Sequence, residues 1–256
     1  MKTACTGTPT SKNRASSAHM KRTLAVLVVL VFAAAALPAQ GRYPAPEGMQ
    51  TIHIAMLYRG PNAGKESTPE TQKIQTAHLA HITKLAKEGH ALIAGPMGGD
   101  GDLRGIIMLK AASADAARAL EADDPAVKAG RLRIEIVSFM TPSNWFTFGP
   151  VKDDLPMRQF VFGFLNVGPK PIGTPEANAA IMDDHLANLW SMRQSGVMVA
   201  GGPAVGSETR AGVVVMVMDS LEKAKALLEQ DPTVKAGRTT VELFPWFAAD
   251  GIMKGR

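Results

Sequence analysis

Two histidine–aspartate pairs are the residues of this chain best suited to do chemistry. His78 and Asp124 recur as His185 and Asp231 at a constant offset of 107 residues (231 − 124). An imidazole can act as a general acid or base when a carboxylate fixes its tautomer and its orientation. We therefore predict that His78 and His185 transfer protons, and that Asp124 and Asp231 orient them.

The histidines lie in segments that should form amphipathic helices. Each falls on an apolar stripe with helical spacing, Ile74, His78, Ile82 and Leu85 in one segment and Ile181, His185, Leu189 and Met192 in the other. A histidine on such a stripe can also be a hydrogen-bonded core residue, and an Asp-Pro step can be a helix cap. Both interpretations stay open, although the histidine is kept in both copies while most of its neighbours differ.

Most of the chain after residue 48 consists of two copies of one module. Residues 124–131 reappear with one change at 231–238, and the same offset carries Gly95-Pro96 onto Gly202-Pro203. A register held this long indicates a duplicated module. We predict a leader at 1–48, modules at 49–141 and 157–248, a linker at 142–156 and a tail at 249–256.

Each module shows the order β-α-β-β-α-β. In the first module we expect strands at 51–58, 91–94, 105–109 and 132–139, and helices at 68–88 and 113–122. This order is typical of a ferredoxin-like α+β fold, in which both helices cover one face of a four-stranded antiparallel sheet. The other face of the sheet then needs a cover, so the two modules should pack sheet to sheet.

Four short motifs occur in the same order in both halves. They are a histidine in the first helix, Gly-Pro after the second strand, Asp-Pro after the second helix and an aromatic residue ending the last strand: His78, Gly95-Pro96, Asp124-Pro125 and Phe139, then His185, Gly202-Pro203, Asp231-Pro232 and Trp246. In this the chain resembles the YciI-like (YCII-related) family. The resemblance implies ferredoxin-like modules paired as a dimeric α+β barrel, here within one chain. It departs from the family where an aromatic residue usually follows Asp-Pro, because Ala126 and Thr233 stand there.

The resemblance also suggests a function. Relatives in the wider superfamily include muconolactone isomerase and a dehydrochlorinase, which implies a small-molecule lyase or isomerase acting on an aromatic or lactone-like substrate. The catalytic residues would be His78, Asp124, His185 and Asp231, while Gly95, Pro96, Gly202 and Pro203 would shape the cavity wall. No cofactor is implied. The alternative is a non-catalytic module of the same fold, whose cavity binds a small ligand or is simply filled.

Other motifs give weaker signals. His78 and His81 lie three residues apart on a helix, but Asn188 replaces His81 in the second copy and no third ligand is evident, so we predict no metal site. The segment 98–102 leads into a strand and is expected to be a hairpin turn, not a phosphate or calcium loop. Four basic residues should be solvated turn residues, with an anionic ligand as the alternative partner: Lys128, Arg131, Lys235 and Arg238.

The N-terminus has the composition of a secretory signal. Lys21-Arg22 precede an apolar run from Leu24 to Leu37, which has the length of a signal-peptide core and is short for a membrane span. We expect cleavage among Ala34, Ala36 and Ala39, hence export to the periplasm or beyond, and no stable membrane anchor afterwards. An uncleaved anchor is the alternative.

The leader also accounts for the positive charge of the chain. Its first forty residues hold five of the 28 basic residues and none of the 23 acidic ones, which leaves 23 of each in the rest of the chain. A near-neutral mature protein gives no support for a nucleic-acid partner. The only cysteine, Cys5, lies in the leader as well, so the mature chain can form no disulfide and carries no thiolate nucleophile. The partners expected are a small-molecule ligand and, beyond the internal pair, a further copy of the chain.

Overall fold

The structure is a computed structural model that describes residues 43–44, 48–64, 66–147, 155–170 and 173–254. The predicted signal peptide and residues 148–154 of the predicted linker lie outside the described residues, so export and the cleavage site stay predictions. None of the helices in the described ranges is both long and apolar enough to cross a membrane.

The first module has the predicted order of elements. It comprises β1 (Met49–Arg59), α1 (Pro69–Lys87), β2 (Ala91–Pro96), β3 (Leu103–Leu109), α2 (Ala114–Ala122), a short helix α3 (Pro125–Lys128) and β4 (Leu132–Pro142). Its strands pair antiparallel in the order β2-β3-β1-β4. This is the arrangement expected of a ferredoxin-like fold.

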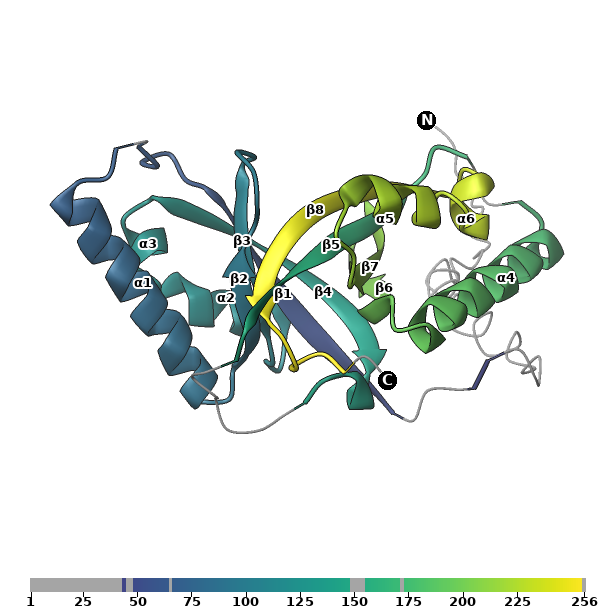
Figure 1. The fold of residues 1–256 in the computed structure, drawn as a ribbon, viewed down its shortest axis with the longest axis horizontal. Helices are drawn as coiled ribbons and strands as arrows, with labels where there is room; N and C mark the ends of the chain where they lie inside the picture. Colours follow the sequence, from purple (N-terminus) through teal and green to yellow (C-terminus); the bar gives the residue numbers. More distant parts are fainter. Residues whose placement is uncertain (1–42, 45–47, 65, 148–154, 171–172, 255–256) are drawn as a thin grey trace, which may run out of the picture. The chain divides into compact units, whose positions relative to one another are not determined.

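The second module repeats it after a short 3-10 helix, η1 (Ser143–Trp145). It comprises β5 (Met157–Val167), α4 (Pro175–Gln194), β6 (Met198–Val205), β7 (Arg210–Met216), α5 (Leu221–Leu228), α6 (Pro232–Lys235) and β8 (Thr239–Ala249). Its antiparallel order is β6-β7-β5-β8. The helices of each module lie on the outer side of its own sheet (Figure 1).

Local signals fix the ends of the two helices that carry the histidines. The Thr68 hydroxyl accepts a hydrogen bond from the Thr71 amide, and the Thr71 hydroxyl accepts one from the Thr68 amide, which forms a capping box at the start of α1. Thr174 caps α4 by accepting a hydrogen bond from the Ala177 amide. Just beyond the two helices stand Gly89 and Gly196, with φ of 78° and 76°. These caps set which side chains face each sheet.

The two sheets join at both edges. β4 pairs with β6 through Ser138 opposite Val205 and Phe139 opposite Ala204, which gives one eight-stranded sheet. At the other edge, Met97 beyond β2 bridges to Trp246 of β8. The two modules therefore close into the α+β barrel predicted from the resemblance, with the second module in the place of a second chain.

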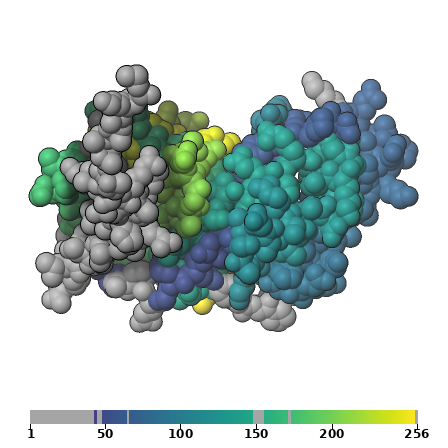
Figure 2. All heavy atoms as spheres, turned by 180° about the vertical axis from the view of Figure 1, so that it is seen from behind, coloured from purple at the N-terminus to yellow at the C-terminus, as the bar shows by residue number. Residues whose placement is uncertain are grey.

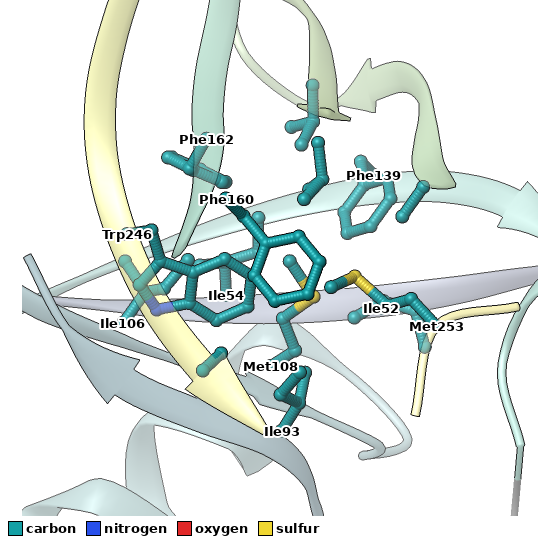
Figure 3. Packing of buried hydrophobic residues seen from close by; sticks show 14 of the residues in the cluster. Ile52, Ile54, Ile93, Ile106, Met108, Phe139, Phe160, Phe162, Trp246 and Met253 are labelled. Atoms are coloured by element: carbon teal, nitrogen blue, oxygen red, sulfur yellow. The ribbon is translucent and has the colours of Figure 1, made fainter. Parts of the chain in front are cut away.

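The interior of the barrel is filled by apolar side chains from both modules. The Trp246 ring lies 5.8 Å from the Phe160 ring and 6.2 Å from the Phe162 ring, measured between centroids, and all three side chains are buried. Ile54 and Ile106 of the first module approach from the opposite sheet (Figure 3). In the space-filling view the blue-to-teal first module and the green-to-yellow second module meet directly (Figure 2). This shared core holds the two modules together.

Glycine is required where the paired strands β4 and β6 of the two modules approach each other closely. A Cβ on Gly202 of β6 would lie 1.9 Å from the carbonyl oxygen of Met140, and the φ of Gly202 is 151°. Gly202→Ala should therefore destabilise the protein by roughly 2–4 kcal/mol, because backbone atoms must move to admit a methyl group. Urea unfolding would measure the loss. Gly101→Ala is the control, since nothing lies within 4 Å of a Cβ there. Equal stability of the two variants would contradict the close approach of β4 and β6 at Gly202.

Candidate functional site

The first histidine–aspartate pair joins α1 to the start of α3. His78 Nδ1 lies 2.5 Å from Asp124 Oδ2, and the other oxygen of Asp124 accepts a hydrogen bond of 2.8 Å from the Ala126 amide. Asp124 is fully buried and His78 is 8% exposed. The aspartate is thus both the cap of α3 and the partner of the histidine, so the two interpretations of Asp-Pro hold together.

The second pair is built in the same way and has more hydrogen bonds. His185 Nδ1 lies 2.8 Å from both oxygens of Asp231. Asp231 also accepts from Asn188 Nδ2 at 2.9 Å and from the amide and hydroxyl of Thr233 at 2.9 and 2.6 Å. Burial raises the pKa of Asp231. The hydrogen bonds from His185, Thr233 and Asn188 and the charge of His185 outweigh this effect and leave the pKa lowered. Asp231 is therefore a carboxylate at neutral pH.

This arrangement leaves one nitrogen of each imidazole for chemistry. A carboxylate at Nδ1 favours the tautomer with its proton there, so Nε2 becomes the acceptor of the neutral ring. Within the described residues, Nε2 of neither histidine has a hydrogen-bond partner. The side chains are 10% and 12% exposed, so each ring is nearly enclosed. Each pair can accept a proton at Nε2 and stabilise the imidazolium that results.

The Gly-Pro motifs lie at the joints between the modules. Gly95 of β2 faces the backbone of Phe247 in β8 and accepts a hydrogen bond of 3.1 Å from Trp246 Nε1. Gly202 faces the backbone of Met140. None of these contacts involves a histidine–aspartate pair. The part of Gly95, Pro96, Gly202 and Pro203 in a ligand cavity stays a prediction.

One buried group near the first pair, Glu121, was missed by sequence reasoning, and a second, His81, was considered only together with His78. Glu121 of α2 is fully buried, and neither of its carboxylate oxygens has a hydrogen-bond partner in the described structure. Burial and the neighbouring Asp124 raise its pKa to about 8. His81 Nε2 is also buried without a partner. One signal could have found the group: the second module has Leu228 where the first has Glu121.

His81, Glu121 and Asp124 form a compact cluster, called here the His81 cluster. Each offers one ligand atom, and these atoms lie within 4.8 Å of one another. Sequence reasoning predicted no metal because no third ligand was evident beside His78 and His81. His78 is not a member of the cluster. The groups beside His81 are Asp124 and Glu121 of α2, which the spacing along α1 could not reveal, and the absence of a metal site stays a prediction.

The remaining motifs have the following environments. The Gly98–Asp102 segment connects β2 to β3, and Arg104 Nη1 donates to the carbonyl oxygens of Gly99 and Gly101 at 3.0 and 3.2 Å. Lys128 makes an exposed ion pair of 2.7 Å with Asp123. Arg131 lines a polar hollow of about 440 Å³ together with Thr71 and Gln75 of α1. Gln75 lies one helical turn before His78.

Comparison with known proteins follows the duplication. The model of the YCII-related domain matches residues 52–140 and again residues 164–247. The chain belongs to the YCII-related domain family. Its two copies of the domain coincide with the two structural modules, and both histidine–aspartate pairs lie inside the matched segments. No curated protein sequence matches the chain.

Solved structures similar to this YCII-related protein include two variants of the chlorite dismutase from Candidatus Nitrospira defluvii. One has 10% sequence identity and a TM-score of 0.54, the other 11% and 0.52; each match covers 79% of this chain and 92% of the other. A protein provisionally assigned as a chlorite dismutase has 12% identity and a TM-score of 0.53, over 78% of this chain and 96% of the other. Similarity at this identity shows the shared fold alone.

Proposed function

We propose that this tandem YCII-related protein acts on a small molecule by proton transfer, as a lyase or isomerase with an aromatic or lactone-like substrate. The observation that carries the proposal is the contact between histidine Nδ1 and a buried aspartate, formed twice in one chain at 2.5 and 2.8 Å. The similarity to chlorite dismutases contributes the fold, and their reaction is not part of the proposal.

The proposed step uses Nε2 as a general base. It removes a proton from a carbon next to the substrate carbonyl. The C–H electron pair forms a carbon–carbon double bond, and the π pair of the carbonyl moves onto its oxygen to give an enolate. The aspartate stabilises the imidazolium meanwhile. Return of the proton to another carbon completes an isomerisation, whereas departure of a leaving group from the neighbouring carbon completes an elimination.

The hollow at the start of α1 offers polar groups to a substrate. Its lining includes the Arg131 guanidinium, the Glu66 carboxylate and the polar side chain of Gln75, which lies one helical turn before His78. A guanidinium can bind a carboxylate or an enolate oxygen with two parallel hydrogen bonds. The repeat keeps this arginine as Arg238. We include Arg131 and Arg238 in the proposal as substrate-binding residues.

Proton exchange in heavy water tests the proposal without knowledge of the full reaction. The protein is incubated in D2O with a panel of unsaturated lactones and hydroxylated aromatic acids, and loss of substrate C–H signals is followed by proton NMR. We expect exchange in the wild type and at least about a 100-fold lower rate in the His78→Gln, His185→Gln double variant, since general-base catalysis contributes roughly 100- to 10,000-fold. Each single variant should keep the exchange of the other module.

His90→Gln is the control, because His90 belongs to neither pair. The near enclosure of both histidines favours the alternative function, a binding module, and the same experiment distinguishes it. Saturation-transfer signals from a ligand without any C–H exchange would indicate binding alone. Exchange that persists in the double variant would exclude the proposed role of the histidines.

A further inference from the structure

We propose that the His81 cluster of the first module binds one divalent transition-metal ion, with His81, Glu121 and Asp124 as ligands. The cluster brings together three ligand atoms, one from each residue, within 4.8 Å of one another. They come from three elements: His81 from α1, Glu121 from α2 and Asp124 from the N-cap of α3. The proposal does not depend on proton transfer by the histidine–aspartate pairs.

The burial of Glu121 is the observation that points to a ligand. A carboxyl group with no exposed surface almost always has hydrogen-bond donors or a metal ion as partner. Glu121 is 0% exposed and both of its oxygens lack a partner, as does the buried Nε2 of His81 beside it. One cation among these atoms would give a partner to all three.

The donor set indicates the class of metal. An imidazole nitrogen with two carboxylates suits Zn²⁺, Mn²⁺, Fe²⁺ or Co²⁺, whereas Ca²⁺ and Mg²⁺ prefer oxygen ligands alone. Asp124 can ligate and keep its other contacts, because each carboxylate oxygen accepts more than one interaction. Its bonds to His78 Nδ1 and to the Ala126 amide would then orient it toward the metal.

The second module provides a natural comparison, since it lacks two of the three ligands. Asn188 stands in place of His81 and Leu228 in place of Glu121. Asn188 donates a hydrogen bond of 2.9 Å to Asp231, so the aspartate there is already satisfied by protein groups. The expected stoichiometry is therefore one metal ion per chain.

The test uses the full chain without a histidine tag. The protein is stripped with a chelator, dialysed and titrated with Zn²⁺ by calorimetry, and the bound metal is counted by elemental analysis. Visible absorption with Co²⁺ reports nitrogen and oxygen ligation. We expect one ion per chain and no comparable binding of Mg²⁺ or Ca²⁺. Glu121→Leu and His81→Asn should each weaken Zn²⁺ binding at least about 100-fold, because loss of even an outer-sphere partner costs 10- to 100-fold.

These two variants copy residues that the second module already uses, so the fold should persist, and circular dichroism would verify it. His90→Asn is the matched control, a histidine of the same module outside the cluster, and should bind Zn²⁺ like the wild type. Absence of binding, two ions per chain, or binding unchanged in Glu121→Leu would each overturn the proposal. His185→Gln separates the two proposals, since it should reduce proton exchange and leave metal binding intact.

Discussion

Replacing Glu121 with leucine should stabilise the metal-free protein, by on the order of 4 kcal/mol at pH 8. The carboxyl group is buried without partners, and burial with the nearby Asp124 raises its pKa from 4.5 to about 8. Between these two values the unfolded chain releases the proton while the folded chain keeps it. The free energy of unfolding of the wild type therefore falls as the pH rises through this window, and leucine removes that loss.

The measurement is urea unfolding in the presence of a chelator. At pH 5 the unfolding free energies of the two proteins should differ by no more than about 1 kcal/mol through ionisation, because this pH lies only just above the pKa of 4.5 that Glu121 has in the unfolded chain. Leu228→Glu is the matched variant, which should introduce the same pH-dependent loss into the second module. An unfolding free energy with the same pH slope in wild type and Glu121→Leu would show that Glu121 is not the group responsible.

Zinc should reverse the sign of this comparison if the His81 cluster binds it. A bound ligand adds RT ln(1 + [L]/Kd) to the free energy of unfolding. Saturating Zn²⁺ should therefore raise the free energy of unfolding of the wild type and leave that of Glu121→Leu unchanged. The same carboxyl group would then cost stability without metal and contribute it with metal. Stabilisation by a bound metal ion would explain why a carboxyl group without hydrogen-bond partners lies in the core.

Much of the fold could be predicted because its signals are local or repeated. Thr68-Pro69 and Thr174-Pro175 mark helix starts, Gly89 and Gly196 mark helix ends, and the duplication confirms each assignment once more. The histidine–aspartate pairs were predicted for the same reason. Each has the same spacing in both copies, and the cap position of the aspartate fixes where its side chain lies.

The joints and the His81 cluster could not be predicted from such signals. The hydrogen bond from Trp246 to Gly95 joins residues 151 positions apart, and no periodic pattern encodes such pairing. An acid in a short amphipathic helix is ordinarily exposed, so the pattern of α2 gives Glu121 no special place. Its burial results from how α2 and α3 meet α1, which is a property of the tertiary structure.

Asp231→Ala should destabilise the protein by about 3–5 kcal/mol, more than Asp124→Ala does. The substitution leaves the Asn188 amide, the Thr233 hydroxyl and the His185 ring without their buried acceptor. It also removes the cap of α6. Asp124 accepts from fewer groups, His78 and the Ala126 amide, so the same substitution there costs less.

The pH dependence identifies the charge as the cause. Since the folded-state pKa of Asp231 is lowered, its contribution is fully present above its unfolded pKa of about 4 and is lost as the pH falls through the folded value. Asp231→Asn keeps the shape and the capping oxygen but not the charge. Its deficit relative to wild type should be largest at pH 7 and shrink toward pH 3 in urea unfolding. A deficit of Asp231→Asn that is constant with pH would assign the stabilisation to the cap alone, as would equal losses in Asp124→Ala and Asp231→Ala. Either result would remove the ionised aspartate on which the proposed tautomer of His185 depends.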